Sequence, residues 1–508
     1  MRKKISNKKL FLILIIPVFI VLDILSCTIL YFIEPIDYTE PDFSQTSYSF
    51  ELYKKYSYEN NYDFYIKQIS SDDIVSFESD KRLKYIDDTI MIICKDGTVT
   101  SEVTSLIAPY NGKICGYISI LNLYQVEFPD SDYEQLVNIC SEYNKSDFVT
   151  ATCVDYFEET PPSDHESEEY TDYEYFYDNY YKDIINYPEN TDCNRDVVVG
   201  IFDSLVDKEN NYFNIINADT YDRKWLDDPQ YMNTVTHGSH VAGIACCSSD
   251  SDAPAIYPDG RIVSDNAFNN SISYWIAAIT DMIVNYNAKA INVSMGYNSF
   301  ITASANLGCE NALNYIENES LFFESFLEKL IDADYEFILC FAAGNDSGMT
   351  VNKIPSSYFS YGDKKLLNKL DLFNIYSKKI RYADAKYSLP FTYIENEKIR
   401  DHIIVVASCD SKKRFTGFSD AGESVDIVAP GEDILSFVLN NEYEICSGTS
   451  MAAPFVTGTA AMIFSYDNSL TAREVKDILL ESATEYVNGY GFEYPLLNVA
   501  QAITFVTE

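Results

Sequence analysis

The stretch from Glu444 to Gly458 reads EICSGTSMAAPFVTG, and it places three hydroxyl residues and a glycine directly before a long apolar run. The run from Met451 to Phe464 is apolar on all sides, which is typical of a buried helix. Ser and Thr often cap helix N-termini and Pro454 is tolerated in a first turn, so helix capping is one interpretation. The alternative is chemical, because a helix N-terminus offers free N–H groups beside a serine oxygen. Acyl transfer uses this arrangement, provided that a base and an orienting acid lie elsewhere in the chain.

Two of the four histidines, His237 and His240, lie in the short segment THGSHVAG, from Thr236 to Gly243. The small residues of this segment predict close backbone approach at the start of a helix. A metal-binding pair is the alternative interpretation, but there is no HExxH pattern and no nearby cysteine to support it. This segment therefore supplies the candidate base.

Asp203 follows the apolar run Val197–Phe202, at the carboxyl end of a predicted buried strand, where open α/β sheets place their sites. Asp207, four residues later, is expected to be a structural carboxylate. Asn345 follows two alanines and a glycine in FAAGND, at the end of another predicted strand. Asn345 has two interpretations: a loop residue that tolerates a turn, or a side chain that donates a hydrogen bond to a negatively charged oxygen.

These segments resemble the motifs of the subtilisin-like serine peptidases (subtilases), in that family's order of Asp, His and Ser. The resemblance covers about residues 190–505. The matching segments are VVVGIFDSLVD with Asp203, THGSHVAG with His237, INVSMG with Ser294–Gly296, FAAGND with Asn345 and SGTSMAAPFVTG with Ser450.

The resemblance implies a serine endopeptidase with an acyl-enzyme intermediate. In this interpretation Ser450 is the nucleophile, and His237 takes the serine proton and later protonates the leaving amine. Asp203 holds the imidazole in the required tautomer. The Asn345 side chain and the Ser450 backbone N–H form the oxyanion hole. A catalytically silent binding protein on the same fold, and a narrow processing peptidase for one exported substrate, are the alternatives.

The resemblance also implies that Ser294, Met295 and Gly296 form a backbone edge, to which an extended peptide adds as a strand. Two residues depart from the family pattern: Leu205 stands where a glycine is usual, and Ser239 stands where a threonine is usual. A positive φ would not suit Leu205. No cofactor is expected, and the calcium sites that are common in the family cannot be traced here residue by residue.

From Asn194 onward, apolar strands alternate with helical segments, which predicts an α/β fold with a doubly wound, mostly parallel sheet. We assign residues 191–508 to this subtilisin-like catalytic domain. Residues 299–335 and 347–400 fit the alternation poorly and are expected to be surface insertions.

A smaller α+β unit is predicted over residues 86–157, with the order βαββαβ of a ferredoxin-like unit. A capping box at Ser131 and Glu134 is expected to begin its second helix. The segment Ile90–Phe128 resembles the inhibitory propeptide of subtilases, which implies a prodomain that assists folding and blocks the cleft until it is cut. A permanent accessory domain is the alternative.

Residues 158–190 are acidic and rich in aromatic side chains, and are interpreted as a solvated linker. Exposed linkers are common sites of proteolysis, so we expect maturation by cleavage between about Phe157 and Asp183.

The N-terminus combines a basic segment, residues 1–9, with a nearly apolar segment, residues 10–33, broken by Asp23. This length can span a bilayer with the basic end inside, which would leave the polar spacer 34–85 and the catalytic domain outside the cell. A cleaved signal peptide with Leu10–Leu22 as its core is the alternative. The expected location is the cell membrane, with a single transmembrane anchor.

Net charge and cysteine content limit the partners of the chain. A net charge of −41 argues against nucleic-acid binding, which needs a basic face. None of the twelve cysteines forms a C-x-x-C pair, so a zinc site is not supported, and disulfide pairing stays open. The expected partners are a peptide or protein substrate, the chain's own propeptide and the membrane.

Overall fold

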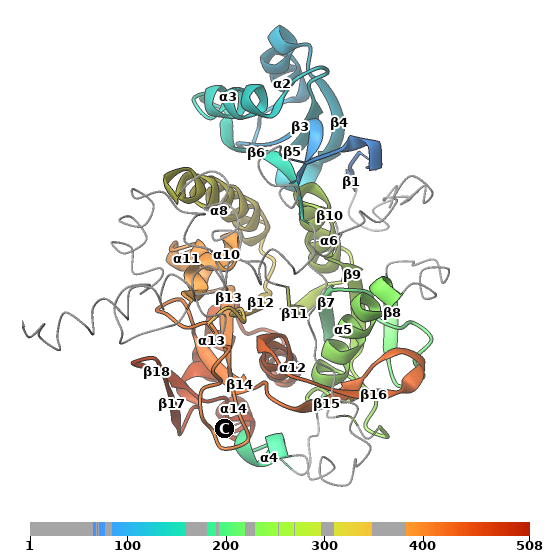
Figure 1. Cartoon of the computed structure of the whole chain (residues 1–508), viewed down its shortest axis with the longest axis vertical. Helices are drawn as coiled ribbons and strands as arrows, with labels where there is room; N and C mark the ends of the chain where they lie inside the picture. Colours follow the sequence, from blue (N-terminus) through green and yellow to red (C-terminus); the bar gives the residue numbers. More distant parts are fainter. Residues whose placement is uncertain are drawn as a thin grey trace, which may run out of the picture. The chain divides into compact units, whose positions relative to one another are not determined.

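The structure is a computed structural model that describes residues 64–67, 69, 71–76, 84–158, 180–188, 193–218, 229–251, 253, 255–268, 270–295, 309–347 and 383–507. The predicted transmembrane segment, residues 10–33, lies outside these residues. No helix in the described part of the chain is long and apolar enough to cross a membrane. We refer to residues 84–158 as the N-terminal unit and to residues 180–507 as the C-terminal unit (Figure 1).

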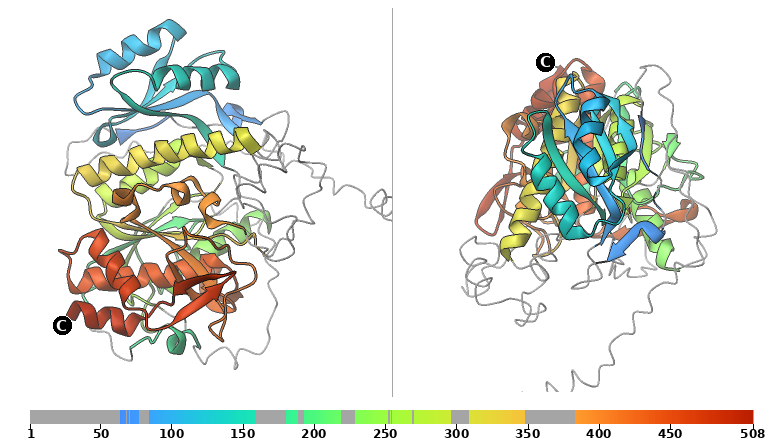
Figure 2. Two further views of the ribbon diagram at one scale, coloured as in Figure 1. Left: turned by 90° about the vertical axis from the view of Figure 1, so that its left-hand side faces the viewer. Right: turned by 90° about the horizontal axis from the view of Figure 1, so that it is seen from above.

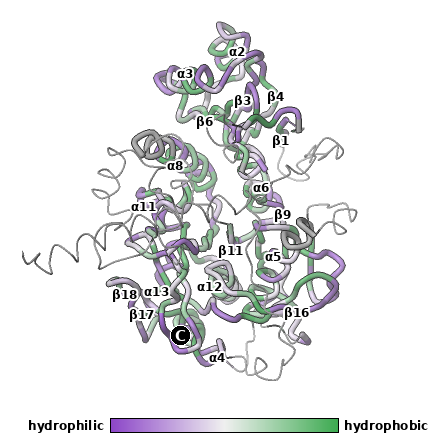
Figure 3. The backbone as a smooth tube through the Cα atoms, viewed as in Figure 1, coloured by the Kyte–Doolittle hydropathy of each residue, from purple (hydrophilic) through white to green (hydrophobic). Residues whose placement is uncertain are grey.

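The N-terminal unit has the expected order βαββαβ, and its two helices cover one face of an antiparallel sheet (Figure 2). Its four strands follow the ferredoxin-like order β4-β5-β3-β6. They belong to a seven-stranded sheet that is completed by three short strands, β1 (Phe64–Tyr65) beside β4, β2 (Ile74–Ser76) beside β3, and β10 (Asn270–Ser271) beside β6. Figure 3 shows hydrophilic and hydrophobic residues mixed along α3, as expected for a helix with one buried face. The elements are β3 (Lys84–Cys94), α2 (Thr100–Ile107), β4 (Lys113–Ile118), β5 (Leu123–Glu127), α3 (Tyr133–Tyr143) and β6 (Val149–Glu158).

The capping box of α3 lies one residue later than the sequence analysis placed it. Asp132 accepts a hydrogen bond from the backbone N–H of Gln135 at 2.9 Å, and the Gln135 side chain accepts one from the Asp132 N–H. The prediction of a capping box at Ser131 and Glu134 was therefore wrong. The observed start directs Leu136 and the other apolar residues of α3 onto the sheet.

The C-terminal unit contains a seven-stranded sheet whose strands are all parallel, which confirms the predicted α/β class. Every residue of its central strands β7, β12 and β13 is buried, as is usual when helices cover both faces of a parallel sheet. In spatial order the strands are β14 (Ile427–Pro430), β13 (Ile403–Cys409), β12 (Ile338–Ala342), β11 (Ala288–Val293), β7 (Val198–Asp203), β9 (Arg261–Asn266) and β8 (Asn214–Ala218).

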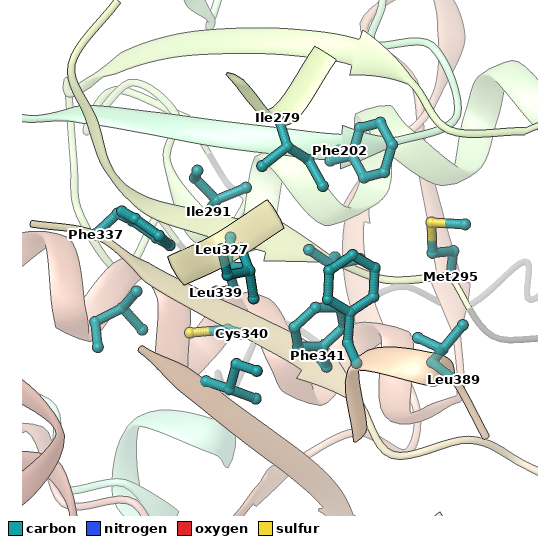
Figure 4. Close-up of a cluster of buried hydrophobic side chains, with 14 of the residues drawn as sticks. Phe202, Ile279, Ile291, Met295, Leu327, Phe337, Leu339, Cys340, Phe341 and Leu389 are labelled. Atoms are coloured by element: carbon teal, nitrogen blue, oxygen red, sulfur yellow. The ribbon is translucent and has the colours of Figure 1, made fainter. Parts of the chain in front are cut away.

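The two faces of this sheet pack against different helices. Ile291 and Leu339 lie beside Ile279 of α6 and Leu327 of α8 (Figure 4). On the other face, Asn292 bonds to Thr457 of α12 at 3.2 Å. Successive side chains of a strand point to opposite faces of the sheet. Polar residues at the ends of β7 and β11 can therefore point to the same face, the one that α12 covers. The helices are α5 (Pro229–Ala245), α6 (Ile272–Val284), α8 (Cys309–Asp332) and α12 (Thr449–Tyr466).

Helix α8 corrects the expectation that residues 299–335 form a surface insertion. Its described side chains include a fully buried apolar stripe that packs onto the sheet and onto short helix α10 (Pro390–Tyr393), where the rings of Phe323 and Phe391 are 4.1 Å apart. The expectation failed because the stripe alternates with charged residues and lowers the overall hydropathy of the segment. The buried members are Phe322, Phe323, Phe326, Leu327 and Leu330.

The two units are joined by backbone pairing and by a buried carboxylate. Strand β6 pairs antiparallel with the short strand β10 (Asn270–Ser271), with Glu158 opposite Asn270. Asp155 is fully buried and accepts hydrogen bonds from the Ser273 N–H at 2.9 Å and the Ser273 hydroxyl at 2.7 Å. Because Ser273 lies in the first turn of α6, the N-terminal unit supplies a carboxylate to a helix N-terminus of the C-terminal unit.

Residues 180–188 were expected in the solvated linker, yet they pack against the rest of the C-terminal unit. The short helix α4 (Tyr180–Ile184) buries Tyr181, whose ring lies 5.3 Å from that of Phe455 on α12. Residues 159–179, which contain most of the predicted cleavage region, lie outside the described residues.

Most of the cysteines that the structure describes are buried. Burial raises the pKa of the Cys94 and Cys340 thiols to about 12. Such thiols are unreactive at neutral pH and behave as small apolar side chains.

Substitution of Phe326 tests the role of α8 as a core element. Phe326→Ala removes a fully buried ring and is expected to lower the free energy of unfolding by about 3–5 kcal/mol. Leu321→Ala on the same helix is the control, because Leu321 is 59% exposed and its loss should change stability by about 0.5 kcal/mol or less. Urea unfolding of both variants measures the difference. Equal stabilities would contradict the assignment of α8 to the core.

Candidate active site

Asp203 and His237 are held in direct contact at the carboxyl edge of the parallel sheet. Asp203 is the last residue of β7 and is fully buried, and His237 lies on α5. The His237 Nδ1 donates to the Asp203 Oδ1 at 2.7 Å, and the Ser204 N–H donates to the same oxygen at 2.6 Å. With Nδ1 bound to a carboxylate, proton exchange with a substrate or nucleophile would use the other ring nitrogen, Nε2.

Close approach of α5 to the turn after β7 makes this contact possible. A Cβ atom on Gly238 would lie only 2.3 Å from the Ser204 carbonyl oxygen, so any larger residue would push the helix away. The Gly238 N–H donates to the Ser204 hydroxyl at 2.7 Å. Leu205 has a negative φ, so its departure from the family pattern causes no backbone strain.

Two neighbours of the pair have structural roles. Asp207 accepts hydrogen bonds from the N–H groups of Glu209 and Asn440, as expected for a structural carboxylate. His240 is buried, and its Nε2 lies 3.0 Å from the Ile434 carbonyl oxygen and 3.1 Å from that of Glu444. His240 therefore fastens α5 to the hairpin of β15 (Ile434–Phe437) and β16 (Tyr443–Cys446), which precedes α12.

Asp203 controls the proton affinity of His237. Burial penalises the imidazolium and would lower the pKa of His237, but the charge of Asp203 and its hydrogen bond outweigh burial and raise this pKa above the ordinary value of 6.5. The folded-state pKa is therefore above the unfolded one. The resulting stabilisation is complete below pH 6.5 and is lost as the pH rises through the folded-state pKa.

The hydroxyl residues at the start of α12 do not cap the helix, which removes the simpler interpretation of this segment. The N-cap is Gly448, without a side-chain hydrogen bond. The Ser447 hydroxyl accepts from the Asp433 N–H at 2.8 Å, and Thr449 bonds to Asn345. Ser450 is half-buried in the first turn, and α12 packs directly against α5.

Ser450 is placed by its backbone. The Ser294 hydroxyl donates to the Ser450 carbonyl oxygen at 3.0 Å and accepts from the Asn292 side chain at 2.7 Å. The described contacts contain no hydrogen bond between the Ser450 hydroxyl and His237. Catalytic hydrogen bonds often form or shorten only when a substrate is bound, so a missing hydrogen bond of this kind does not argue against Ser450 as a nucleophile.

Asn345 lies beside the first turn of α12, at the end of β12. Its side-chain oxygen accepts hydrogen bonds from the Thr449 N–H at 2.9 Å and the Thr449 hydroxyl at 3.0 Å. A backbone N–H can only donate, so the amide oxygen must face Thr449. The amide nitrogen of this exposed residue is thereby left to donate elsewhere.

The predicted substrate edge is only partly described. Ser294 and Met295 follow β11 and are buried, and Gly296 lies outside the described residues. The sequence analysis did not predict the short strand β10, which pairs with β6. The ring of Phe268, two residues before β10, lies 6.0 Å from the ring of His237. Because β10 is two residues long, no alternating pattern could have revealed it.

Within the described residues, no group of three or more His, Cys, Asp and Glu side chains is arranged to hold a metal ion. The expectation that the chain needs no cofactor stays a prediction, as does the question of calcium.

Comparison with known proteins places these features in one family. The model of the subtilase family matches residues 194–494. The chain is 28% identical over 286 residues to the thermophilic serine proteinase of Bacillus sp. (strain AK1), covering 55% of this chain and 54% of that protein. It is 26% identical over 271 residues to subtilisin DY of Bacillus licheniformis, covering 52% of this chain and 77% of that protein. The chain thus spans about half the length of the first of these relatives.

A solved structure extends the likeness to the fold. The epidermin leader peptide processing serine protease of Staphylococcus aureus matches with a TM-score of 0.50 at 15% identity, over 83% of this chain and 98% of that chain.

Titration of the histidines tests the coupling of His237 to Asp203. His402 is an internal control, because burial lowers its pKa below 6.5 and it precedes the amino end of β13, at the opposite edge of the parallel sheet. Histidine NMR is expected to give a midpoint above 6.5 for His237 and below 6.5 for His402. Asp203→Asn should lower the midpoint of His237 only. A His237 midpoint that does not respond to Asp203→Asn would contradict the coupling.

Proposed function

Because the chain belongs to the subtilase family of serine peptidases, we propose that it is an endopeptidase that cleaves peptide bonds through an acyl-enzyme on Ser450. The observation that carries this proposal is the partly buried hydrogen bond between Asp203 and His237, on α5, which packs against a helix whose first turn holds Ser450. The proposal covers the peptidase activity of the chain, its substrates and its location.

In the proposed mechanism, the Ser450 hydroxyl attacks the carbonyl carbon of the substrate and His237 Nε2 accepts its proton. Asp203 keeps the imidazole oriented and stabilises its charged form. The Asn345 amide nitrogen and the Ser450 N–H donate to the oxyanion that develops on the carbonyl oxygen. Loss of one such donor typically costs about 10²–10³ in kcat. His237 then protonates the leaving amine, and water hydrolyses the acyl-enzyme.

The N-terminal unit is proposed to be an inhibitory prodomain. Its last strand, β6, pairs with β10. Strand β10 follows Phe268, whose ring lies beside the ring of His237. The chain therefore leaves the N-terminal unit close to the proposed catalytic pair. An extended segment that adds to a sheet edge in this way occupies the edge as a peptide substrate would. Cleavage between about Phe157 and Asp183 would free the segment. A permanent accessory domain would instead remain uncut.

The proposed location is the outer face of the cell membrane, with residues 10–33 as the anchor. A narrow substrate range is the alternative to general degradation. The neighbour from Staphylococcus aureus is named for processing a leader peptide, although 15% identity supports the fold alone. A peptide library would separate the two by giving one sharp cleavage motif or a broad pattern.

Intact mass and N-terminal sequencing of the purified protein test the zymogen directly. The wild type is expected to be cut between about residues 157 and 183, and Ser450→Ala is expected to remain whole because the nucleophile is lost. Ser447→Ala is the matched control, since Ser447 lies in the same motif but bonds to the Asp433 N–H, and it should be processed like the wild type. Cleavage of Ser450→Ala at the same site would contradict self-processing.

Substitution of Asp155 tests how the proposed prodomain is held. Asp155→Ala, made in the Ser450→Ala background, removes the acceptor of the Ser273 N–H and hydroxyl and should weaken docking by about 10–100-fold. Hydrogen exchange at β10 and the first turn of α6 measures this change. Asp96→Ala is the control, because Asp96 pairs with Lys329 of α8 while 84% exposed, and such surface pairs contribute little. Equal exchange in both variants would contradict the role of Asp155.

A further inference from the structure

Asp420 lies in the segment of chain that connects β13 to β14, and its side chain is completely buried. The proposed mechanism does not use this carboxyl group. Its Oδ1 accepts hydrogen bonds from the N–H groups of Asp346 and Ser347, each at 2.8 Å. The Asp420 N–H donates to the Gly344 carbonyl oxygen at 2.9 Å. The residue therefore holds the backbone on both sides of Asn345.

The segment that carries Asn345 needs such support. It follows β12 without regular structure, and Asn345 itself is exposed. Gly344 has a φ of +109°, and a Cβ atom there would lie 2.3 Å from Asp420 Oδ2, so the carboxyl packs directly on the Gly344 backbone. An oxyanion donor is effective only when its position is fixed before the reaction, because reordering during the reaction would cost free energy.

The far side of the carboxyl is also held. The Ser388 hydroxyl donates to the Ala343 carbonyl oxygen at 2.8 Å and lies 3.2 Å from Asp420 Oδ2. Burial and the nearby charge of Asp346 raise the pKa of Asp420 well above its usual range. A neutral carboxyl can donate from Oδ2 to Ser388 while Oδ1 accepts from the backbone. An asparagine has the same pattern of one acceptor and one donor.

We propose that Asp420 is a positioning residue for the oxyanion donor Asn345, which it acts on by fixing the backbone of Gly344, Asp346 and Ser347. This inference rests on the proposed function, since it assigns to Asp420 a part in the same reaction. The side chain of Asn345 is anchored separately, by Thr449, so the two contacts together fix both the backbone and the amide.

A double-mutant cycle tests this role, with kcat measured per active site on a peptide substrate. Asp420→Ala is expected to lower kcat by about 10–50-fold and to change KM by less than about 3-fold, because the lost interaction matters in the transition state. In the Asn345→Ala background the same change should cost less than about 3-fold, since the group that Asp420 positions is already absent. Asp420→Asn should restore kcat to within about 3-fold of the wild type.

Asp384→Ala is the control for loss of a nearby, half-buried carboxyl. Asp384 lies beside the same loop and bonds to the Lys386 N–H, not to the backbone around Asn345. It should lower the unfolding temperature and leave kcat unchanged. If Asp420→Ala does not fold, Gly344→Ala disturbs the same contact from its other side, because the added methyl group would lie 2.3 Å from Asp420 Oδ2. Its loss of kcat should likewise vanish in the Asn345→Ala background.

Three results would overturn the inference, and they are distinguishable. An equal loss of kcat from Asp420→Ala in both backgrounds, or no rescue by Asp420→Asn, would show that Asp420 does not act through Asn345. No loss of kcat in Asn345→Ala would remove Asn345 from the oxyanion hole, which refutes that part of the proposed function together with the role of Asp420.

Discussion

The hydrogen bond between the Asp203 carboxylate and His237 is the interaction on which the account of this protein depends. Asp203 is fully buried and the His237 side chain is 11% exposed. Burial alone would disfavour the charged imidazole, and the Asp203 carboxylate offsets this cost by its charge and its hydrogen bond. The parallel sheet places Asp203 at its carboxyl edge, and Gly238 lets α5 approach closely enough for His237 to reach it. The same edge receives Ser294 and Asn345 from neighbouring strands, and these residues hold the first turn of α12.

A second constraint concerns the N-terminal unit. Its contacts with the C-terminal unit include the pairing of β6 with β10 and the carboxylate of Asp155, which accepts hydrogen bonds from Ser273 in the first turn of α6. Both contacts lie in the segment that follows Phe268, whose ring approaches His237. In the proposed zymogen, release of the unit would therefore expose an edge strand and a helix N-terminus at the same time.

The parallel sheet and the candidate catalytic residues could be predicted from the sequence, because each of them lies in a local motif. Asp203 ends an apolar run and Ser450 follows a glycine at the start of an apolar helix. What failed depended on contacts between distant segments. The apolar stripe of α8 was hidden among charged residues, and the strand β10 exists only through its pairing with β6. Asp420 resembled any loop aspartate until the structure placed it against the backbone around Asn345.

The central claim is that Ser450 is a nucleophile activated by His237, and labelling with a fluorophosphonate probe tests it most directly. Such a probe forms a covalent adduct with an activated serine, and mass spectrometry of the digested protein identifies the labelled residue. The account predicts one adduct, on Ser450, that is lost in His237→Ala and retained in His240→Ala. An adduct on another serine, or labelling that persists in His237→Ala, would contradict it.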